Sequence, residues 1–412
     1  MTLTRWLKAA VPAALLLAAC NDPNGPSPGN PIDALPRQLS VGEGKLISAS
    51  NAFAFDLLKV VNASDRSANV FISPLSASMA LGMTMNGAAG TTYDAMHSTL
   101  RFGDLSRTEV NESYKSLIEL IRGLDKSTQL QIANSIWYEQ TWPFRQEFLT
   151  ESKSYFDAEV KGLDLTKPAS ADAINAWVSD ATSKKIPKII DNVDGDEVMF
   201  LINAIYFKGI WQSQFEKSKT VDAPFHALDG TSANVPLMSQ MSQFRRGFGN
   251  DYVAIDLPYG NSAFTMVVVL PNSGVDINAF TENLTEAKWN AIDAGMTKGE
   301  IGIVLPRFKL DWKKTLNDQL KALGMAVAFD DRAADFSRMS SSTTRLIITD
   351  VIQKTYVDVN EEGTEAAAAT SVGVGPTSAP AYIRVDRPFV FAIRERLSGT
   401  ILFMGKITKL PA

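Results

Sequence analysis

The feature that most constrains this chain is a stretch near its C-terminal end, residues 357–380. It begins with the alternation Val357-Asp358-Val359-Asn360, which is typical of a half-buried strand. It then passes through Glu361-Glu362-Gly363 into Thr364, Glu365 and four alanines. Because alanine is the best helix former, one interpretation is a short exposed helix capped by Thr364. Such a helix would have only about two turns, which is marginal without packing.

The same stretch can also be read as a strand, since side chains on a strand alternate between its two faces. With Thr364 pointing inward, the inner face would carry Thr364, Ala366, Ala368, Thr370, Val372 and Val374, and the outer face would carry Glu365, Ala367, Ala369, Ser371, Gly373 and Gly375. The inner set is small or apolar, and no proline occurs between Thr364 and Pro376. The stretch is therefore loop-like and open to cleavage, yet patterned as a strand.

The remainder of the chain predicts an α+β fold in one large unit, residues 45–412. Apolar residues at helical spacing predict a helix over 45–61. Ser73 as a side-chain cap and Pro74 at the first helical position predict a second helix, which should end near Asn86. A third helix should begin near Ser170. Strands are predicted over 264–270, 346–348, 355–359, 389–393 and 400–404.

The N-terminal end predicts export. Arg5 and Lys8 precede a short apolar run, and Leu17-Ala18-Ala19-Cys20 follows, so residues 1–19 fit a signal peptide. This tetrapeptide resembles the bacterial lipobox, whose cysteine is lipidated, and Cys20 is the one cysteine of the chain. The alternative is a plain secretory signal with an incidental cysteine. Residues 20–44 are rich in proline, glycine and small polar residues at their start and predict a flexible tether.

The sequence carries no sign of catalysis or of a cofactor. There are two histidines, His97 and His226, and no Gly-x-Ser-x-Gly elbow, His-Glu-x-x-His motif or glycine-rich phosphate loop. One cysteine excludes a cysteine-built metal cluster. A net charge of -5 without a basic run argues against nucleic-acid partners. We therefore predict neither an enzyme nor a metal or cofactor site.

Residues 360–370 resemble the proximal hinge of inhibitory serpins almost letter for letter. Other serpin landmarks follow in the family's order: Phe71–Ser76 resembles the start of helix B, 201–211 the third strand of the central sheet, and 335–340, 387–391 and 403–406 further signatures. The resemblance covers nearly everything after the tether. It implies the serpin fold, in which helices surround a large central mixed β-sheet and smaller sheets, with an exposed reactive-centre loop at about 361–385.

The resemblance also implies a function. In the family, a target serine protease cleaves the loop and forms an acyl-enzyme, and the loop then inserts into the central sheet and traps the protease. The hinge carries over to Glu361, Gly363, Thr364, Glu365, Ala366, Ala367, Ala368, Ala369 and Thr370. The family spacing of 27 positions between the hinge glutamate and the Pro-Phe-Val proline holds for Glu361 and Pro388, and it places the reactive bond at Thr377-Ser378. A small β-branched Thr377 favours elastase-like or subtilisin-like targets, with cysteine proteases possible.

By the same resemblance, five residues should hold the sheet closed at its middle and top: Ser73, Ser76, Asn203, Trp211 and Gln353. Gln353 stands where many serpins have a histidine, but its amide can still donate and accept. The implied protein is a monomeric inhibitor, exported and held at the bacterial cell envelope, at the outer membrane or cell surface, by a lipid on Cys20, or else released outside the cell. The alternative is a non-inhibitory serpin that binds or scaffolds, against which the small hinge residues argue.

Overall fold

The computed structural model describes residues 29–193, 198–364 and 381–411. Its α-helices are α1 (Val41–Ser64), α2 (Pro74–Met85), α3 (Gly90–Thr99), α4 (Arg107–Arg122), α5 (Gln146–Phe156), α6 (Ala169–Ala181), α7 (Ile277–Glu282), α8 (Glu286–Ala294) and α9 (Asn317–Leu320). Its strands are β1 (Val70–Ile72), β2 (Gln129–Glu139), β3 (Glu159–Leu163), β4 (Met199–Ile210), β5 (Val221–His226), β6 (Ser232–Phe248), β7 (Tyr252–Pro258), β8 (Phe264–Pro271), β9 (Thr297–Pro306), β10 (Phe308–Thr315), β11 (Ile352–Val359), β12 (Gly363–Thr364), β13 (Tyr382–Arg384), β14 (Phe389–Glu395) and β15 (Ile401–Ile407).

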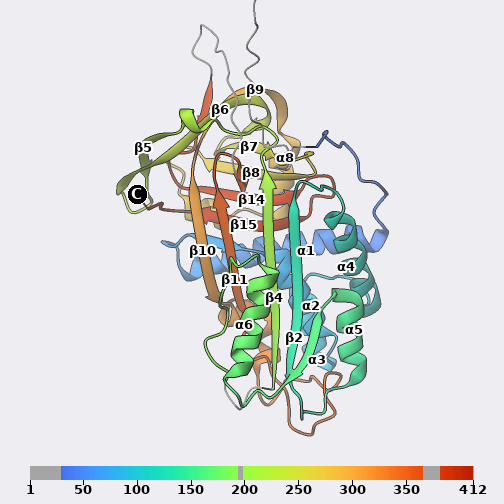
Figure 1. The fold of residues 1–412 in the computed structure, drawn as a ribbon. Coiled ribbons are helices and arrows are strands. Elements are labelled where there is room, and N and C mark those ends of the chain that lie inside the picture. The colour runs from blue at the N-terminus through green and yellow to red at the C-terminus, as the bar shows by residue number, and fades with distance from the viewer. Residues whose placement is uncertain (1–28, 194–197, 365–380, 412) are drawn as a thin grey trace, which may run out of the picture.

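The central sheet has the strand order β10-β11-β12-β4-β2-β3. All neighbouring pairs are antiparallel except β2 and β3, which are parallel, so the sheet is mixed. The long strands run side by side along the molecule, with the tip of the β4 arrow at its upper end (Figure 1). The strand β12 has only two residues and lies at that upper end, between β11 and β4.

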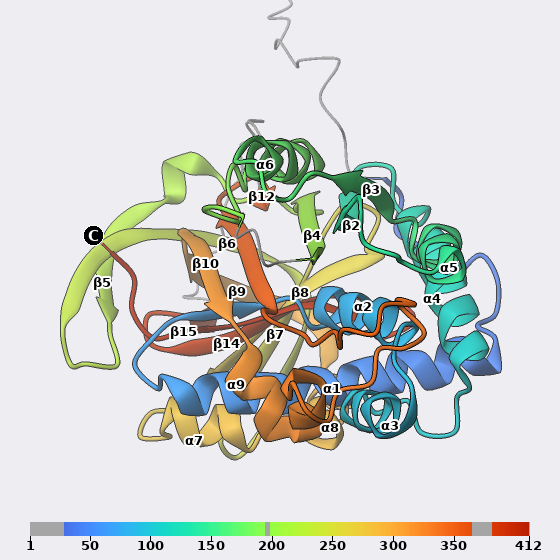
Figure 2. The same cartoon turned by 90° about the horizontal axis from the view of Figure 1, so that it is seen from below.

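Behind the central sheet lies a second strand system, ordered β1-β15-β14-β8-β7-β6-β9-β13, with β5 paired to β6. Its inner strands β8, β14 and β15 are buried at every residue, because helices and the central sheet cover both faces. Seen from below, α6 lies on the outer side of the central sheet, α2 between the two strand systems, and α1, α7 and α8 on the far side (Figure 2).

Most predicted elements are confirmed. The helices over 45–61 and 74–86 correspond to α1 and α2, and the one expected near Ser170 corresponds to α6, whose Ile174 and Val178 are buried. Four of the predicted strands correspond to β8, β11, β14 and β15. The long strands β2 and β4 lie in the first half of the chain, so strands occur along the whole described domain.

The strand predicted over 346–348 is wrong. These residues have no strand assignment, although Leu346 and Ile348 pack against the core. The neighbouring strand β10 ends at Thr315, opposite Ile352, and the chain then turns into α9. A strand-like sequence therefore finds no partner on that side.

The chain packs against the folded domain well before residue 45. The first helix begins at Val41, where Ser40 and Glu43 form a capping box. Ahead of it, Arg37 makes two hydrogen bonds to the buried Glu43 carboxylate, at 2.8 and 2.6 Å. Apolar side chains of this segment, Ile32, Leu35 and Leu39, pack against the core. The last part of the predicted flexible tether of residues 20–44 thus lies on the domain.

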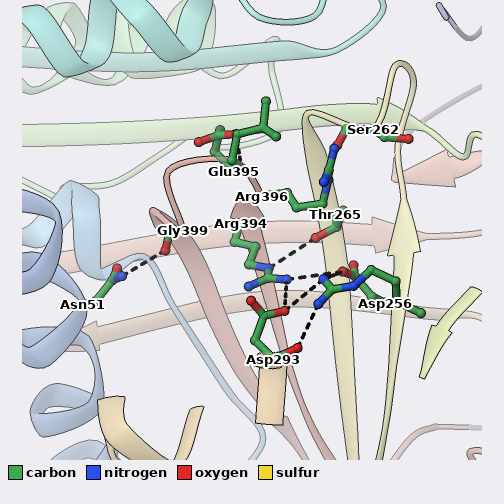
Figure 3. A network of polar contacts seen from close by, with 11 residues as sticks. Asn51, Asp256, Ser262, Thr265, Asp293, Arg394, Glu395, Arg396 and Gly399 are labelled. Atoms are coloured by element: carbon green, nitrogen blue, oxygen red, sulfur yellow. Dashed lines mark hydrogen bonds and ion pairs between the residues drawn. The ribbon is translucent and has the colours of Figure 1, made fainter. Parts of the chain in front are cut away.

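A buried ion network ties α8 to the second strand system. Arg394 on β14 donates to Asp256 on β7 at 3.2 Å and to Asp293 on α8 at 2.6 Å (Figure 3). Arg245 on β6 contacts the same two carboxylates, each at 3.0 Å. Burial alone would raise the pKa of Asp293, but hydrogen bonds and charge from Arg394 and Arg245 outweigh it and lower the pKa.

Candidate functional site at the hinge and central sheet

The hinge begins inside the central sheet. Thr364 pairs with Val359 of β11 on one side and with Gly209 of β4 on the other, antiparallel to both. Gly363 has φ of +156°, and a Cβ there would overlap the carbonyl oxygen of Gly209. Only glycine allows this close approach of two backbones.

Two ion pairs hold the residues before this short strand. The Glu361 carboxylate accepts a short hydrogen bond from Arg307 and one of 2.7 Å from the Thr220 hydroxyl. The Glu362 carboxylate pairs with Lys217 at 2.6 Å. Burial raises the pKa of Glu361, but the hydrogen bonds from Arg307 and Thr220 more than offset this, so its pKa lies below the usual value.

An aromatic stack supports the hinge from behind. The Trp211 ring lies 4.3 Å from the Tyr259 ring, at 12° between planes. The Trp211 indole donates to the carbonyl of Asn360 at 2.9 Å, and its backbone N–H donates to the carbonyl of Glu362 at 2.8 Å. The Tyr259 hydroxyl is 2.7 Å from the Thr364 hydroxyl. Thr364 is therefore buried and faces inward, as the strand interpretation requires.

Gln353 bridges β11 to the start of α2. Its Oε1 accepts from the Ser73 backbone N–H at 3.1 Å, and its Nε2 donates to the Ser73 carbonyl at 2.8 Å. The Ser73 hydroxyl donates to the carbonyl of Leu402 at 2.8 Å. The prediction that this hydroxyl caps α2 is wrong, because it is turned toward β15 instead.

Asn203 on β4 lies across from this bridge. Its amide nitrogen donates to the side chain of Asn134, while its Oδ1 is buried and has no hydrogen-bond partner among the described residues. Ser76 is buried on α2. A small cavity is lined by Ser76, Asn203 and Gln353 together, so these three residues share one space.

Below β12, the described parts of β4 and β11 do not pair with each other. We call this interval the slot. The small cavity lies in it, and a second one of about 560 Å³ lies further down. The larger cavity is lined by β4 residues 199–202 and by 344–350 with Ile352. The slot has the two flanking strands of a sheet without the strand between them.

The structure thus brings Glu361, Gly363, Thr364 and Trp211 together at the top of the slot, and Ser73, Ser76, Asn203 and Gln353 at its middle. Glu365 to Thr370, Thr377, Ser378 and Cys20 lie outside the described residues. Sequence reasoning missed Arg307, Lys217 and Tyr259. Their contacts with the hinge join residues far apart in the chain, and ordinary surface cations give no signal of such pairing.

Both histidines of the chain make contacts within the described residues. His97 contacts the carbonyl of Leu105 at 2.7 Å, and the exposed His226 contacts Ser232 at 3.0 Å. No described carboxylate orients the His226 ring, so a triad is not formed there. The described ranges hold no group of three metal-ligating side chains. None of their helices combines the length and apolar character that crossing a membrane requires.

Comparison with known proteins accounts for this arrangement. The family model described as Serpin (serine protease inhibitor) matches residues 48–410. The human leukocyte elastase inhibitor is 35% identical over 381 residues, which cover 88% of this chain and 99% of that protein. A serpin-like protein of Methanosarcina acetivorans is 33% identical over 404 residues, covering 95% and 93%.

Two solved structures share the fold. The native state of Tengpin, a thermophilic serpin, has a TM-score of 0.83 and 29% identity, covering 93% of this chain and 97% of that one. Human thyroxine-binding globulin in complex with its hormone has a TM-score of 0.83 and 27% identity, covering 90% and 100%. With a family match across nearly the whole domain and relatives above 30% identity, this chain belongs to the serpin family, and its fold is the α+β serpin fold.

Proposed function

We propose that this serpin is an inhibitory suicide substrate of serine proteases. The observation that carries the proposal is that β12 already occupies the top of the slot, antiparallel to both flanking strands. A cleaved loop would continue from Thr364 as a strand in the same register. No catalytic group or cofactor of the serpin is needed, because the energy comes from relaxation of a metastable fold under kinetic control.

The register of β12 defines where each inserted residue would lie. Since Thr364 is opposite Gly209 and Val359, Ala366 would lie opposite Phe207 and Val357. Continuing in steps of two, Thr370 would lie opposite Asn203 and Gln353, and Val374 opposite Met199. A threonine hydroxyl at that place can donate to Asn203 Oδ1, the buried acceptor that has no partner in the part of the chain that the structure describes.

The small inner side chains fit this path. Alanines at 366 and 368 can pass between the packed flanking strands without a large steric barrier. A bulky or charged residue would have to displace core side chains such as Phe207, which is buried.

The proposed reactive bond is Thr377-Ser378, cut by elastase-like or subtilisin-like proteases. A small β-branched residue before the bond suits a shallow apolar pocket. Relatives named leukocyte elastase inhibitor, from human and pig, support an elastase-like target. Cysteine proteases are a further class that such a loop could meet.

We also propose that the protein is a monomer exported by residues 1–19 and held at the bacterial cell envelope by a lipid on Cys20. The support is the apolar export segment followed by Leu17-Ala18-Ala19-Cys20. Mass spectrometry of the membrane fraction would test it. A Cys20→Ala variant that stays in the membrane would contradict it.

A binding protein without inhibition is the second candidate. The similarity to thyroxine-binding globulin, solved with thyroxine, favours it. The run from Ala366 to Ala369 argues against it, because such small residues are needed only if the hinge inserts.

The test mixes residues 21–412 with elastase-like, trypsin-like and subtilisin-like proteases on denaturing gels. We expect a detergent-stable band at the summed mass and cleavage after Thr377. Clean cleavage by every protease, without such a band, would overturn the inhibitory function.

A further inference from the structure

The N-terminal segment of this serpin is fixed at one end of the molecule. We call residues 29–40 the strap, because they run across the domain surface before α1. The Ile32 backbone N–H donates to the carbonyl of Asn261 at 2.9 Å, and the Ile32 carbonyl accepts from Arg396 at 2.6 Å. At the other end of the strap, Arg37 binds Glu43 and the Ser116 hydroxyl, the latter at 2.8 Å. The strap is thus held at both ends.

The attachment point of the strap lies beside the hinge. Asn261 is in the turn between β7 and β8, and the Gly260 N–H of that turn donates to the carbonyl of Ile210 at 2.9 Å. Ile210 is the β4 residue that pairs with Gly363. Tyr259 of the same turn contacts Thr364. We call this end, with Trp211, Tyr259 and Thr364, the reactive pole.

The start of the described chain, in dark blue, lies at the same upper end as the tip of β4 (Figure 1). Cys20 precedes Gly29 by nine positions. Nine residues span at most about 30 Å even when fully extended. A group attached to Cys20 therefore stays within that distance of the strap's first residues.

We propose that a lipid on Cys20 holds the reactive pole toward the bilayer, so that the anchored inhibitor presents its loop to the membrane side. This inference rests on the lipid anchor proposed above. A protease of about 230 residues is about 45 Å across, by the usual scaling of globular size. It does not fit between the bilayer and a pole held within about 30 Å, so a freely diffusing protease is hindered.

The single cysteine makes the test direct. Purified residues 20–412 are coupled through Cys20 to maleimide-lipid in neutral vesicles. The matched control is the double variant Cys20→Ser, Gln140→Cys, because Gln140 is exposed just after β2, at the opposite end of the central sheet from Trp211. We call this double variant the far-end form, since its lipid is attached at position 140.

A third form keeps Cys20 and has about 40 Gly/Ser residues inserted after Asn24, which would give the tether an r.m.s. span of about 35 Å beyond its present length. We call it the long-tether form. The readout for all forms is the rate at which soluble subtilisin cuts the loop, followed as loss of intact chain.

We expect anchoring through Cys20 to slow cleavage by about tenfold relative to the unanchored chain, since it restricts the approach of the protease. The far-end form and the long-tether form should be cut at the unanchored rate. Equal rates for anchoring through Cys20 and for the far-end form, whether fast or slow, would overturn the proposed orientation. Cleavage of the loop is measured whether or not a covalent complex forms. Absence of the complex would therefore contradict the proposed inhibitory function and leave the proposed orientation unaffected.

Discussion

Gln353 shows how a single residue can keep a role while its chemistry changes. Its amide fills the donor and acceptor needs of one backbone unit, Ser73, in a buried place. A neutral imidazole has one donor and one acceptor as well, but protonation removes the acceptor. An amide makes this bridge insensitive to pH.

Replacing Gln353 by leucine should destabilise the intact chain. The Ser73 N–H would be left buried and unpaired, at a cost of about 1–3 kcal/mol, while the Ser73 carbonyl would keep its hydrogen bond from the Ala77 N–H. A fall in the thermal midpoint, measured by circular dichroism, would show it. The matched control is Gln131→Leu, on an exposed position of β2, which should leave the midpoint nearly unchanged. Equal midpoints for the two variants would contradict the bridging role.

The contacts of the Glu361 carboxylate with Arg307 and Thr220 should weaken in acid. The folded-state pKa of Glu361 is below the usual value, so its stabilisation is complete above the usual carboxyl pKa of about 4.3 and is lost as the pH falls through the lower folded pKa. Arg307→Gln should therefore lower the thermal midpoint more at pH 7 than at pH 3, which lies below the usual carboxyl pKa. Arg332→Gln, at an exposed position, is the control. A loss of the same size at both pH values would show that the ion pair is not the cause.

At the scale of elements, sequence reasoning located those whose pattern is local. The helices α1, α2 and α6 and the buried strand β8 were predictable from apolar spacing and capping residues. The strands β2, β6 and β9 carry many polar side chains and were missed. The apolar run 346–348 was wrongly predicted as a strand because a strand also needs a partner, which a sequence pattern does not show.

The site was predictable only in part, because only some of its residues form a local motif. Residues 360–364 form a continuous motif, and their place at the top of the sheet follows the resemblance. Their partners Arg307, Lys217 and Tyr259 come from other elements and have no motif of their own. Contacts of this kind depend on the register of distant strands.

The short strand β12 makes the sharpest prediction at this scale. Thr364→Arg would place a long cation where Thr364 now contacts Tyr259, and it should block insertion. The inhibitor should become a substrate, with cleavage retained and the covalent complex lost. Glu365→Arg, which the strand alternation in the sequence would place on the outer face, is the matched control and should still inhibit. Full inhibition by the Thr364 variant on denaturing gels would contradict loop insertion.

At the scale of the whole molecule, the two strand systems differ in how tightly they are packed. The second strand system is closed and buried, and the ion network of Arg394, Asp256 and Asp293 fixes α8 to it. The central sheet is instead parted along the slot, with unfilled space of about 560 Å³ in its lower half. One strand system is closely packed, while the central sheet has room for one more strand.

Arg394→Met should therefore destabilise the molecule without converting inhibitor to substrate. It removes the buried cation that Asp256 and Asp293 share, and because Arg245 still contacts both carboxylates, the cost should lie below the value of about 3–5 kcal/mol for an uncompensated buried charge. Urea unfolding would measure the loss, and gels would measure inhibition. The double variant Arg394→Met with Asp256→Leu should regain part of the stability. Loss of complex formation at a temperature where the single variant is fully folded would contradict this separation.

The central claim is that the slot receives the cleaved loop as a strand, and thermal unfolding before and after cleavage tests it most directly. The loop of residues 21–412 is nicked near Thr377 by a protease that is then removed, and both forms are heated in a calorimeter. We predict that the cleaved form unfolds at a much higher temperature than the intact form, because a new central strand fills the slot and pairs with both β4 and β11. An unchanged or lower unfolding temperature after cleavage would contradict insertion and leave this serpin as a binding protein.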